Sequence, residues 1–147
     1  PALISVSATT SSDQRAGFSS YGAYIDVSAP GASIITTARG GGYATVSGTS
    51  FSSPTTAGVL ALIMAANPAL SPSQVEDILF QTADDLGSPG WDQYYGYGRV
   101  NAATAVLAAL QTPTADVQAP SATICWNLSP SVSFEMKISA RIPSRIC

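Results

Sequence analysis

The sequence contains no histidine, so it supplies no imidazole that could act as a general base. Its only two cysteines, Cys125 and Cys147, are too few for a disulfide framework, although one bridge between them stays an open alternative. Charged residues make up 10% of the chain and the net charge is −3, which argues against a basic nucleic-acid-binding surface. The longest uninterrupted apolar stretch, residues 59–66, falls short of the ~18 residues of a membrane span. We therefore expect no nucleic acid and no membrane as partners.

Hydrophobic residues make up 46% of the 147 residues, which is enough for the core of one domain of ordinary size. Little charge and many Ser, Thr, Ala and Gly residues suit a secreted protein. The sequence begins with Pro1 on a strand-like run, without Met and without a visible signal peptide. We therefore interpret the chain as the middle of a larger protein.

The pattern of the first half predicts four short strands, at residues 3–8, 24–31, 33–38 and 43–48, separated by Gly, Ser and Pro. A helix is predicted over residues 49–67, and because its apolar residues cover nearly all faces we expect it to be buried. Ser71, Pro72 and Gln74 are typical of a capped helix start, with Gln74 completing a capping box. A last short helix is predicted at residues 101–110. Strands followed by helices indicate an α/β arrangement with a parallel sheet.

The corner formed by Gly48, Thr49 and Ser50 joins the last predicted strand to the long helix. Gly48 permits a tight turn, and Thr49 or Ser50 can cap the helix. Ser50 would also lie where backbone N–H groups are unpaired, which is where a serine nucleophile could use them to stabilise negative charge. Pro54, one turn into the helix, predicts an irregular first turn. A plain helix cap and a nucleophile are both open from this corner alone.

The residues around this corner resemble the nucleophile segment of the subtilisin-like serine proteases, the subtilases. The stretches "RAGFSSYG", "DVSAPG" and "GYGRVNAATA" are similar to further segments of that family, and the resemblance extends from Pro1 to about Leu110. It implies a domain at residues 1–110 that is part of a three-layer α/β fold, with a mostly parallel sheet flanked by helices. The residues that match the nucleophile motif are Gly48, Thr49, Ser50, Ser53, Pro54, Ala57 and Gly58.

The resemblance implies that Ser50 is the catalytic serine of an endopeptidase acting on polypeptides, with its own N–H as one oxyanion-hole donor. In the family the catalytic Asp, the catalytic His and the second oxyanion donor, an Asn, all precede this region. We therefore expect a fragment that lacks the upstream half of the catalytic domain and is inactive alone. No cofactor is expected in this chain, although full-length family members can hold structural calcium. The alternative is a catalytically dead relative that binds peptides or partners.

For the other candidate residues we favour structural roles over functional ones. Asp26 is expected to have a structural role. No metal site is expected beside it, because hard cations require several oxygen ligands. Asp84 and Asp85 are interpreted as solvated surface. Four aromatic residues are expected to pack the loop that holds them, although sugar or base stacking is an alternative; these are Trp91, Tyr94, Tyr95 and Tyr97.

The composition changes after Leu110. Residues 111–120 have the composition of a linker, and we expect residues 111–147 to be an irregular tail that does not pack on the domain. The tail carries three of the six basic residues and shows no clear period. A truncated domain and a reading-frame slip near Ile124 are both open explanations.

Overall fold

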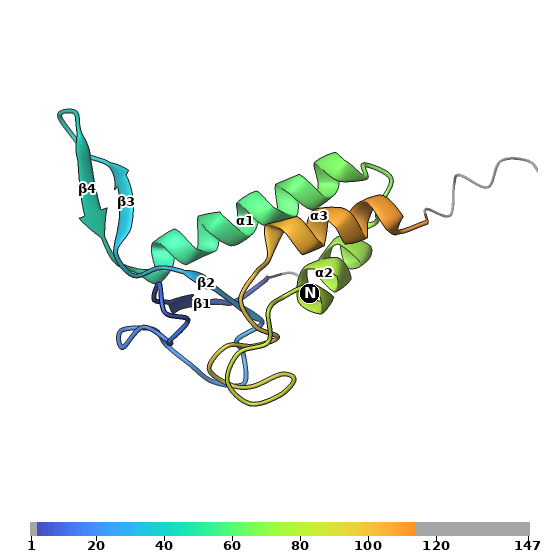
Figure 1. Ribbon diagram of the computed structural model, residues 1–147, viewed down its shortest axis with the longest axis horizontal. Coiled ribbons are helices and arrows are strands. Elements are labelled where there is room, and N and C mark those ends of the chain that lie inside the picture. Colours follow the sequence, from blue (N-terminus) through green and yellow to red (C-terminus); the bar gives the residue numbers. More distant parts are fainter. Residues whose placement is uncertain (1–2, 114–147) are drawn as a thin grey trace, which may run out of the picture. The chain divides into compact units, whose positions relative to one another are not determined.

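The computed structural model describes residues 3–113, which form a mixed assembly of helices and short strands (Figure 1). The chain divides into two units, Pro1–Thr112 and Pro113–Cys147, and the elements below all belong to the first unit. The elements are, in order, β1 (Val6–Thr9), β2 (Val27–Pro30), β3 (Ile34–Thr37), β4 (Tyr43–Val46), α1 (Thr49–Ala66), α2 (Pro72–Gln81) and α3 (Ala102–Gln111).

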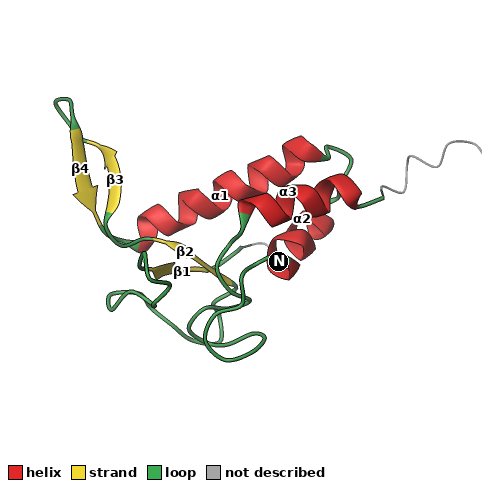
Figure 2. Cartoon of the chain, in the orientation of Figure 1, coloured by secondary structure: helices red, strands yellow, loops and turns green. Residues whose placement is uncertain are grey.

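The strands form two separate pairs (Figure 2). β1 and β2 are parallel, with Val6 opposite Val27, and Ser28 of β2 makes a further parallel bridge to Arg99. β3 and β4 form an antiparallel hairpin, so the expected mostly parallel sheet holds only for β1 and β2. The hairpin closes through residues 40–42, three glycines with positive φ that the turn requires. The α/β class is confirmed in this coarse form.

α1 begins and ends close to its predicted limits, but the prediction that it is buried is wrong. Only four of its 18 residues are buried, namely Ser52, Thr56, Val59 and Ile63. These residues face β1, β2 and the other two helices, which together cover one side of α1 (Figure 1). The opposite side of the helix has no cover from the described residues.

α2 begins as the sequence predicts. The Ser71 hydroxyl accepts a hydrogen bond from the Gln74 N–H at 3.3 Å, and the Gln74 side chain accepts one from the Ser71 N–H at 2.9 Å. This capping box and Pro72 in the first turn satisfy N–H groups that a helix start leaves unpaired. The buried face of α2 consists of Val75, Ile78 and Leu79.

α3 is also where the sequence places a helix, and the Asn101 side chain caps it by accepting from the Thr104 N–H at 3.1 Å. One hydrophobic core joins β2 to the three helices, with Ile63 of α1 and Leu79 of α2 fully buried. The other core residues are Val27, Ala29, Val59, Val75, Ile78, Val100, Ala105 and Ala109.

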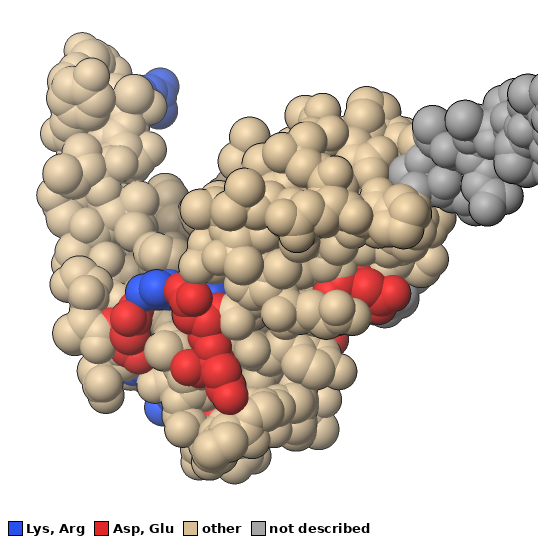
Figure 3. Space-filling view, turned by 45° about the vertical axis from the view of Figure 1, so that its right-hand side comes forward, with Lys and Arg blue, Asp and Glu red and all other residues tan. Residues whose placement is uncertain are grey.

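Charged side chains occupy little of the surface. In the view of Figure 3 most of them lie in the lower part of the unit, a blue patch lies near its top, and most of the remaining surface is uncharged. Among the described residues, α1 is long and apolar enough to cross a membrane, but a core helix of a soluble protein passes the same test. One such helix is weak evidence, and the expectation of no membrane partner stays a prediction.

Candidate functional site

Ser50 is the second residue of α1 and is exposed to solvent. The helix N-cap is Gly48, and no side-chain hydrogen bond caps this end. The alternative that Thr49 or Ser50 is a plain helix cap does not hold, because the cap position falls one or two residues earlier. The Ser50 hydroxyl is thus not engaged in capping the helix.

Gly48 makes room for the Ser50 hydroxyl. A Cβ added at Gly48 would lie 3.0 Å from Ser50 Oγ, which is tighter than ordinary van der Waals contact. The Gly48 N–H donates to the Gly31 carbonyl at 2.8 Å, and the Gly48 carbonyl accepts from the Phe51 N–H at 3.1 Å. Glycine at this corner therefore keeps the hydroxyl accessible while its backbone ties the corner to the end of β2.

A second anchor lies two residues after Ser50. Ser52 is fully buried, and its hydroxyl donates to the Ala29 carbonyl at 3.0 Å. Gly31 packs so closely against this side chain that an added Cβ would lie 2.3 Å from Ser52 Oγ and 2.7 Å from the Ala8 Cβ. Positions 48 and 52, on either side of Ser50, are thus both held by the end of β2. The motif "DVSAPG" was the available signal for this anchor, but its contact with the serine corner cannot be seen in the sequence.

Ser53 and Pro54 both lie on the exposed side of the first turns of α1. Pro54 lies within the helix and has no N–H, so it cannot donate to the carbonyl four residues earlier, which is that of Ser50. The Thr55 hydroxyl donates to the Phe51 carbonyl at 2.8 Å, a side-chain bond within the same turns. The motif residues thus shape the helix start rather than forming one cluster of side chains.

The arrangement can supply part of the chemistry of acyl transfer. The first N–H groups of a helix have no intrahelical acceptor, and the helix dipole is positive there, so this end suits a developing oxyanion. The first turn of α1 contains no acidic residue that would oppose such a charge. Because the chain has no histidine, it offers no imidazole to take the proton from Ser50.

Asp26 has the structural role expected of it. Its carboxylate accepts a hydrogen bond from the Ser5 N–H at 2.7 Å, and its own N–H donates to the Ser5 carbonyl at 3.0 Å. These two bonds join the start of β2 to the residues before β1. Within the described part of the chain, no three His, Cys, Asp or Glu side chains gather in a way that could hold a metal ion.

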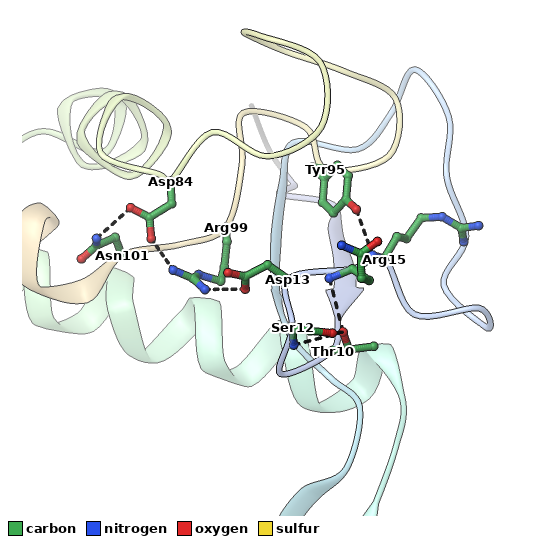
Figure 4. A network of polar contacts seen from close by, with 9 residues as sticks. Thr10, Ser12, Asp13, Arg15, Asp84, Tyr95, Arg99 and Asn101 are labelled. Carbon is green, nitrogen blue, oxygen red and sulfur yellow. Dashed lines mark hydrogen bonds and ion pairs between the residues drawn. The ribbon is translucent and has the colours of Figure 1, made fainter.

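Asp85 is exposed, as the sequence suggested, whereas Asp84 has a side chain that is 38% exposed and is ion-paired. Figure 4 shows it between Asn101, whose amide donates to it at 3.0 Å, and Arg99, whose guanidinium lies at 2.5 Å and also pairs with Asp13. The hydrogen bonds from Asn101 and Arg99 hold the pKa of Asp84 below its usual value. Bonds to Asp84 and Asp13 raise the pKa of the Arg99 guanidinium. The ion-pair partner of Asp84 is thus Arg99, which lies 15 residues later in the chain. Two adjacent aspartates in a sequence do not reveal such a partner.

The aromatic loop is packed only in part, because Trp91, Tyr94 and Tyr97 are 43%, 39% and 45% exposed although several loop side chains contact the rest of the unit. The Trp91 indole N–H donates to the Ile25 carbonyl at 2.9 Å, and the Tyr97 ring stacks on Phe80 with centroids 5.0 Å apart. The Tyr95 hydroxyl accepts from the Arg15 N–H at 3.0 Å (Figure 4). These contacts bind the loop to the body of the unit.

Several predictions lie outside the described residues. They are the character of the tail from residue 114 onward, the explanations offered for the change near Ile124, and the pairing of Cys125 with Cys147. They stay predictions.

Comparison with known proteins defines the family. A sequence model described as the Subtilase family matches residues 1–98. Over 101 residues the chain is 46% identical to subtilisin NAT of Bacillus subtilis subsp. natto, an alignment that covers 69% of this chain and 26% of the relative. An extracellular protease of Xanthomonas campestris is 45% identical over 117 residues, covering 74% of this chain and 20% of that protein.

A solved structure agrees with the sequence relatives. A protease from Pseudoalteromonas arctica has a similar fold, with a TM-score of 0.66, 34% sequence identity, and coverage of 73% of this chain and 36% of that one. The chain thus belongs to the subtilase family. It spans between a fifth and about a third of the length of these three relatives.

Proposed function

We propose that the chain is part of the catalytic domain of a secreted serine endopeptidase, in which Ser50 is the nucleophile. The observation that carries this proposal is the position of Ser50. Its hydroxyl is exposed at the start of α1, free of any capping bond, and both of its flanks are anchored to the end of β2. Membership of a protease family and the extracellular protease among the relatives support the reaction and the secretion.

In the proposed reaction, Ser50 Oγ attacks the carbonyl carbon of a peptide bond. The tetrahedral intermediate carries its charge on the former carbonyl oxygen, which the Ser50 N–H can stabilise. Loss of the amine leaving group gives an acyl-enzyme, which water then hydrolyses. The base that takes the proton, its Asp partner and the second oxyanion donor belong to the part of the domain that the longer relatives contain. That part would also complete the three-layer fold, while the residues after Thr112 follow the domain; Gln111, which the sequence assigned to the tail, is the last residue of α3.

The 147 residues alone are proposed to be inactive. A protease of this type that lacks one triad member still exceeds the uncatalysed rate by roughly 10³–10⁴, through its oxyanion hole and substrate binding. This chain lacks the imidazole, and losing one oxyanion donor typically costs a further ~10²–10³ in rate. The proposed reaction needs no cofactor, and a structural calcium, which full-length family members can hold, would belong to the longer protein.

A longer polypeptide from the same gene tests the nucleophile. It should be labelled by a fluorophosphonate, which reacts with activated serines, and should cleave a denatured protein substrate. Ser50→Ala should abolish both, while Ser88→Ala, at an exposed serine outside the nucleophile motif, should keep both within about threefold. Activity that survives Ser50→Ala in a folded protein would overturn the proposal.

The absence of histidine also favours a second candidate, a catalytically dead subtilase that binds peptides or partners. The encoding DNA separates the two. In-frame segments carrying an Asp and a His of the family upstream of Pro1 support the endopeptidase. A start codon directly before Pro1 supports the binding protein.

A further inference from the structure

The hairpin formed by β3 and β4 stands apart from the hydrophobic core. In the described part of the chain its two strands pair only with each other, and the core contains no residue of the segment 32–48. Figure 1 shows the hairpin projecting away from the three helices. No residue of this segment is buried, and Ile35 and Tyr43 are 73% and 79% exposed. Because two strands without further packing are only marginally stable, the hairpin opens more easily than the rest of the unit.

The tip of the hairpin is an open turn. Gly40, Gly41 and Gly42 all have positive φ, and a Cβ added at any of them would meet nothing within 4 Å. Arg39 directly precedes these glycines. It is exposed, and its guanidinium makes no hydrogen bond or ion pair with the described residues. Exposed loop tips made of small residues are preferred sites of proteolytic cleavage, and glycine gives the backbone the freedom to enter a protease cleft.

The other two arginines of the described part are held in place. The guanidinium of Arg15 donates to the Ser19 carbonyl at 2.5 Å and lies 4.9 Å from the centre of the Tyr21 ring. Arg99 pairs with two aspartates, and its backbone N–H and carbonyl both bond to the backbone of Asp84. A protease that cuts after either arginine must first break these contacts, whereas the hairpin can open without loss of the core.

We propose that the Arg39–Gly40 bond is a processing site, at which an endopeptidase that cleaves after arginine cuts the chain in two. Water adds across the peptide bond, which leaves a carboxylate on Arg39 and an amine on Gly40. The cut is made by another enzyme, so the inference goes beyond the proposed function and does not depend on it.

The two pieces stay associated after the cut. Residues 1–39 contain β1, β2 and β3, while residues 40–147 contain β4 and the three helices. β2 shares one hydrophobic core with the helices. The two hydrogen bonds that anchor the serine corner, from Gly48 and Ser52 to the end of β2, also join one piece to the other. The cut therefore separates the strands of the hairpin and leaves the serine corner anchored.

Limited digestion of the 147-residue chain with trypsin, followed over time by mass spectrometry, tests the site. We expect cleavage after Arg39 to be at least about tenfold faster than cleavage after Arg15 or Arg99. Cuts beyond residue 113 are scored separately. Under native conditions, size-exclusion chromatography of the cut protein should show residues 1–39 in one peak with the helical piece. Arg39→Gln should remove this cut and leave the rates at the other two arginines unchanged.

Ala103→Arg is the matched control, because Ala103 is exposed but lies in α3, which packs on the core. Circular dichroism checks that this variant keeps the fold. The arginine introduced there should be cut at least about tenfold more slowly than Arg39, since a protease reaches it only when the helix unfolds. Equal cleavage at both positions would show that exposure alone selects the site. That result, earlier cleavage after Arg15 or Arg99, or separation of the two pieces would each overturn the proposal.

Discussion

The loop from Asp84 to Asn101 and the helix α1 both lie in the region that resembles subtilases. They differ in whether their side chains find interaction partners within this chain. The loop is polar and rich in glycine, and its Asp, Arg, Trp and Tyr side chains find their partners within this chain. α1 is uncharged and apolar, and most of its surface finds none among the described residues. The difference teaches that short-range polar contacts can be satisfied within these 147 residues, while an apolar helix needs packing layers on every side.

The largest effect is expected in the loop, at Gly96. Its φ is +64°, and an added Cβ would lie 2.2 Å from the Asp26 carbonyl oxygen. Gly96→Ala should therefore destabilise the unit by more than about 3 kcal/mol, because both the backbone conformation and the contact forbid a side chain. Urea unfolding followed by circular dichroism measures this.

Gly90→Ala is the matched control, because its φ is also positive, at +79°, but an added Cβ meets nothing within 4 Å. It should lower the free energy of unfolding by only about 1 kcal/mol, because only the positive φ disfavours the side chain. Equal effects of the two substitutions would show that the close contact between the loop and β2 does not hold.

A smaller effect is expected at the anchor of the serine corner. Ser52→Ala removes the buried hydrogen bond to the Ala29 carbonyl and should destabilise the unit by about 1–3 kcal/mol. In the proposed longer enzyme it should also slow labelling of Ser50, because the helix start is less firmly held. Ser53→Ala should stay within about 0.5 kcal/mol, since Ser53 is exposed. If Ser52→Ala left the free energy of unfolding unchanged, the hydrogen bond of Ser52 would not anchor the serine corner.

The pH dependence of stability tests the network around Arg99. The pKa of Asp84 is lower in the folded state than its usual 3.8, so its contribution to stability is fully present above that pH and is lost as the pH falls through the folded pKa. Because the Asp84 side chain is 38% exposed, solvent screening keeps the effect below about 1 kcal/mol. Asp84→Asn should therefore flatten the fall in urea midpoint below about pH 4. An unchanged slope would contradict the network.

A small and purely local effect is expected at the start of α2. Ser71→Ala removes the hydroxyl that accepts from the Gln74 N–H and should cost about 1 kcal/mol in the urea midpoint analysis. Ser71→Asp, which keeps a capping oxygen, should stay within about 0.5 kcal/mol of the parent. An Ala variant as stable as the Asp variant would mean that the cap contributes nothing.

The sequence allowed prediction where the decisive interactions are local. The cap of α2 depends on three residues within one turn, and its position was predicted correctly. The burial of α1 and the role of Asp84 were predicted wrongly, because each depends on residues far away in the chain. The apolar residues on all sides of α1 indicate that the helix is stable when packed on all sides. The pattern does not show whether residues of this chain provide that packing. Likewise, the close packing of Gly31 against Ser52, which anchors the serine corner, brings together two motifs that are separate in sequence.

The central claim is that Ser50 is a subtilase nucleophile that lacks its activating groups in this chain. Fluorophosphonate labelling followed by peptide mapping tests it most directly, on the 147-residue chain alone and on a polypeptide from the same gene that is extended upstream. The account predicts no labelling of Ser50 in the short chain and labelling of Ser50 in the extended one. Labelling of Ser50 in the short chain would show that a base within these residues activates it, and the account would be wrong.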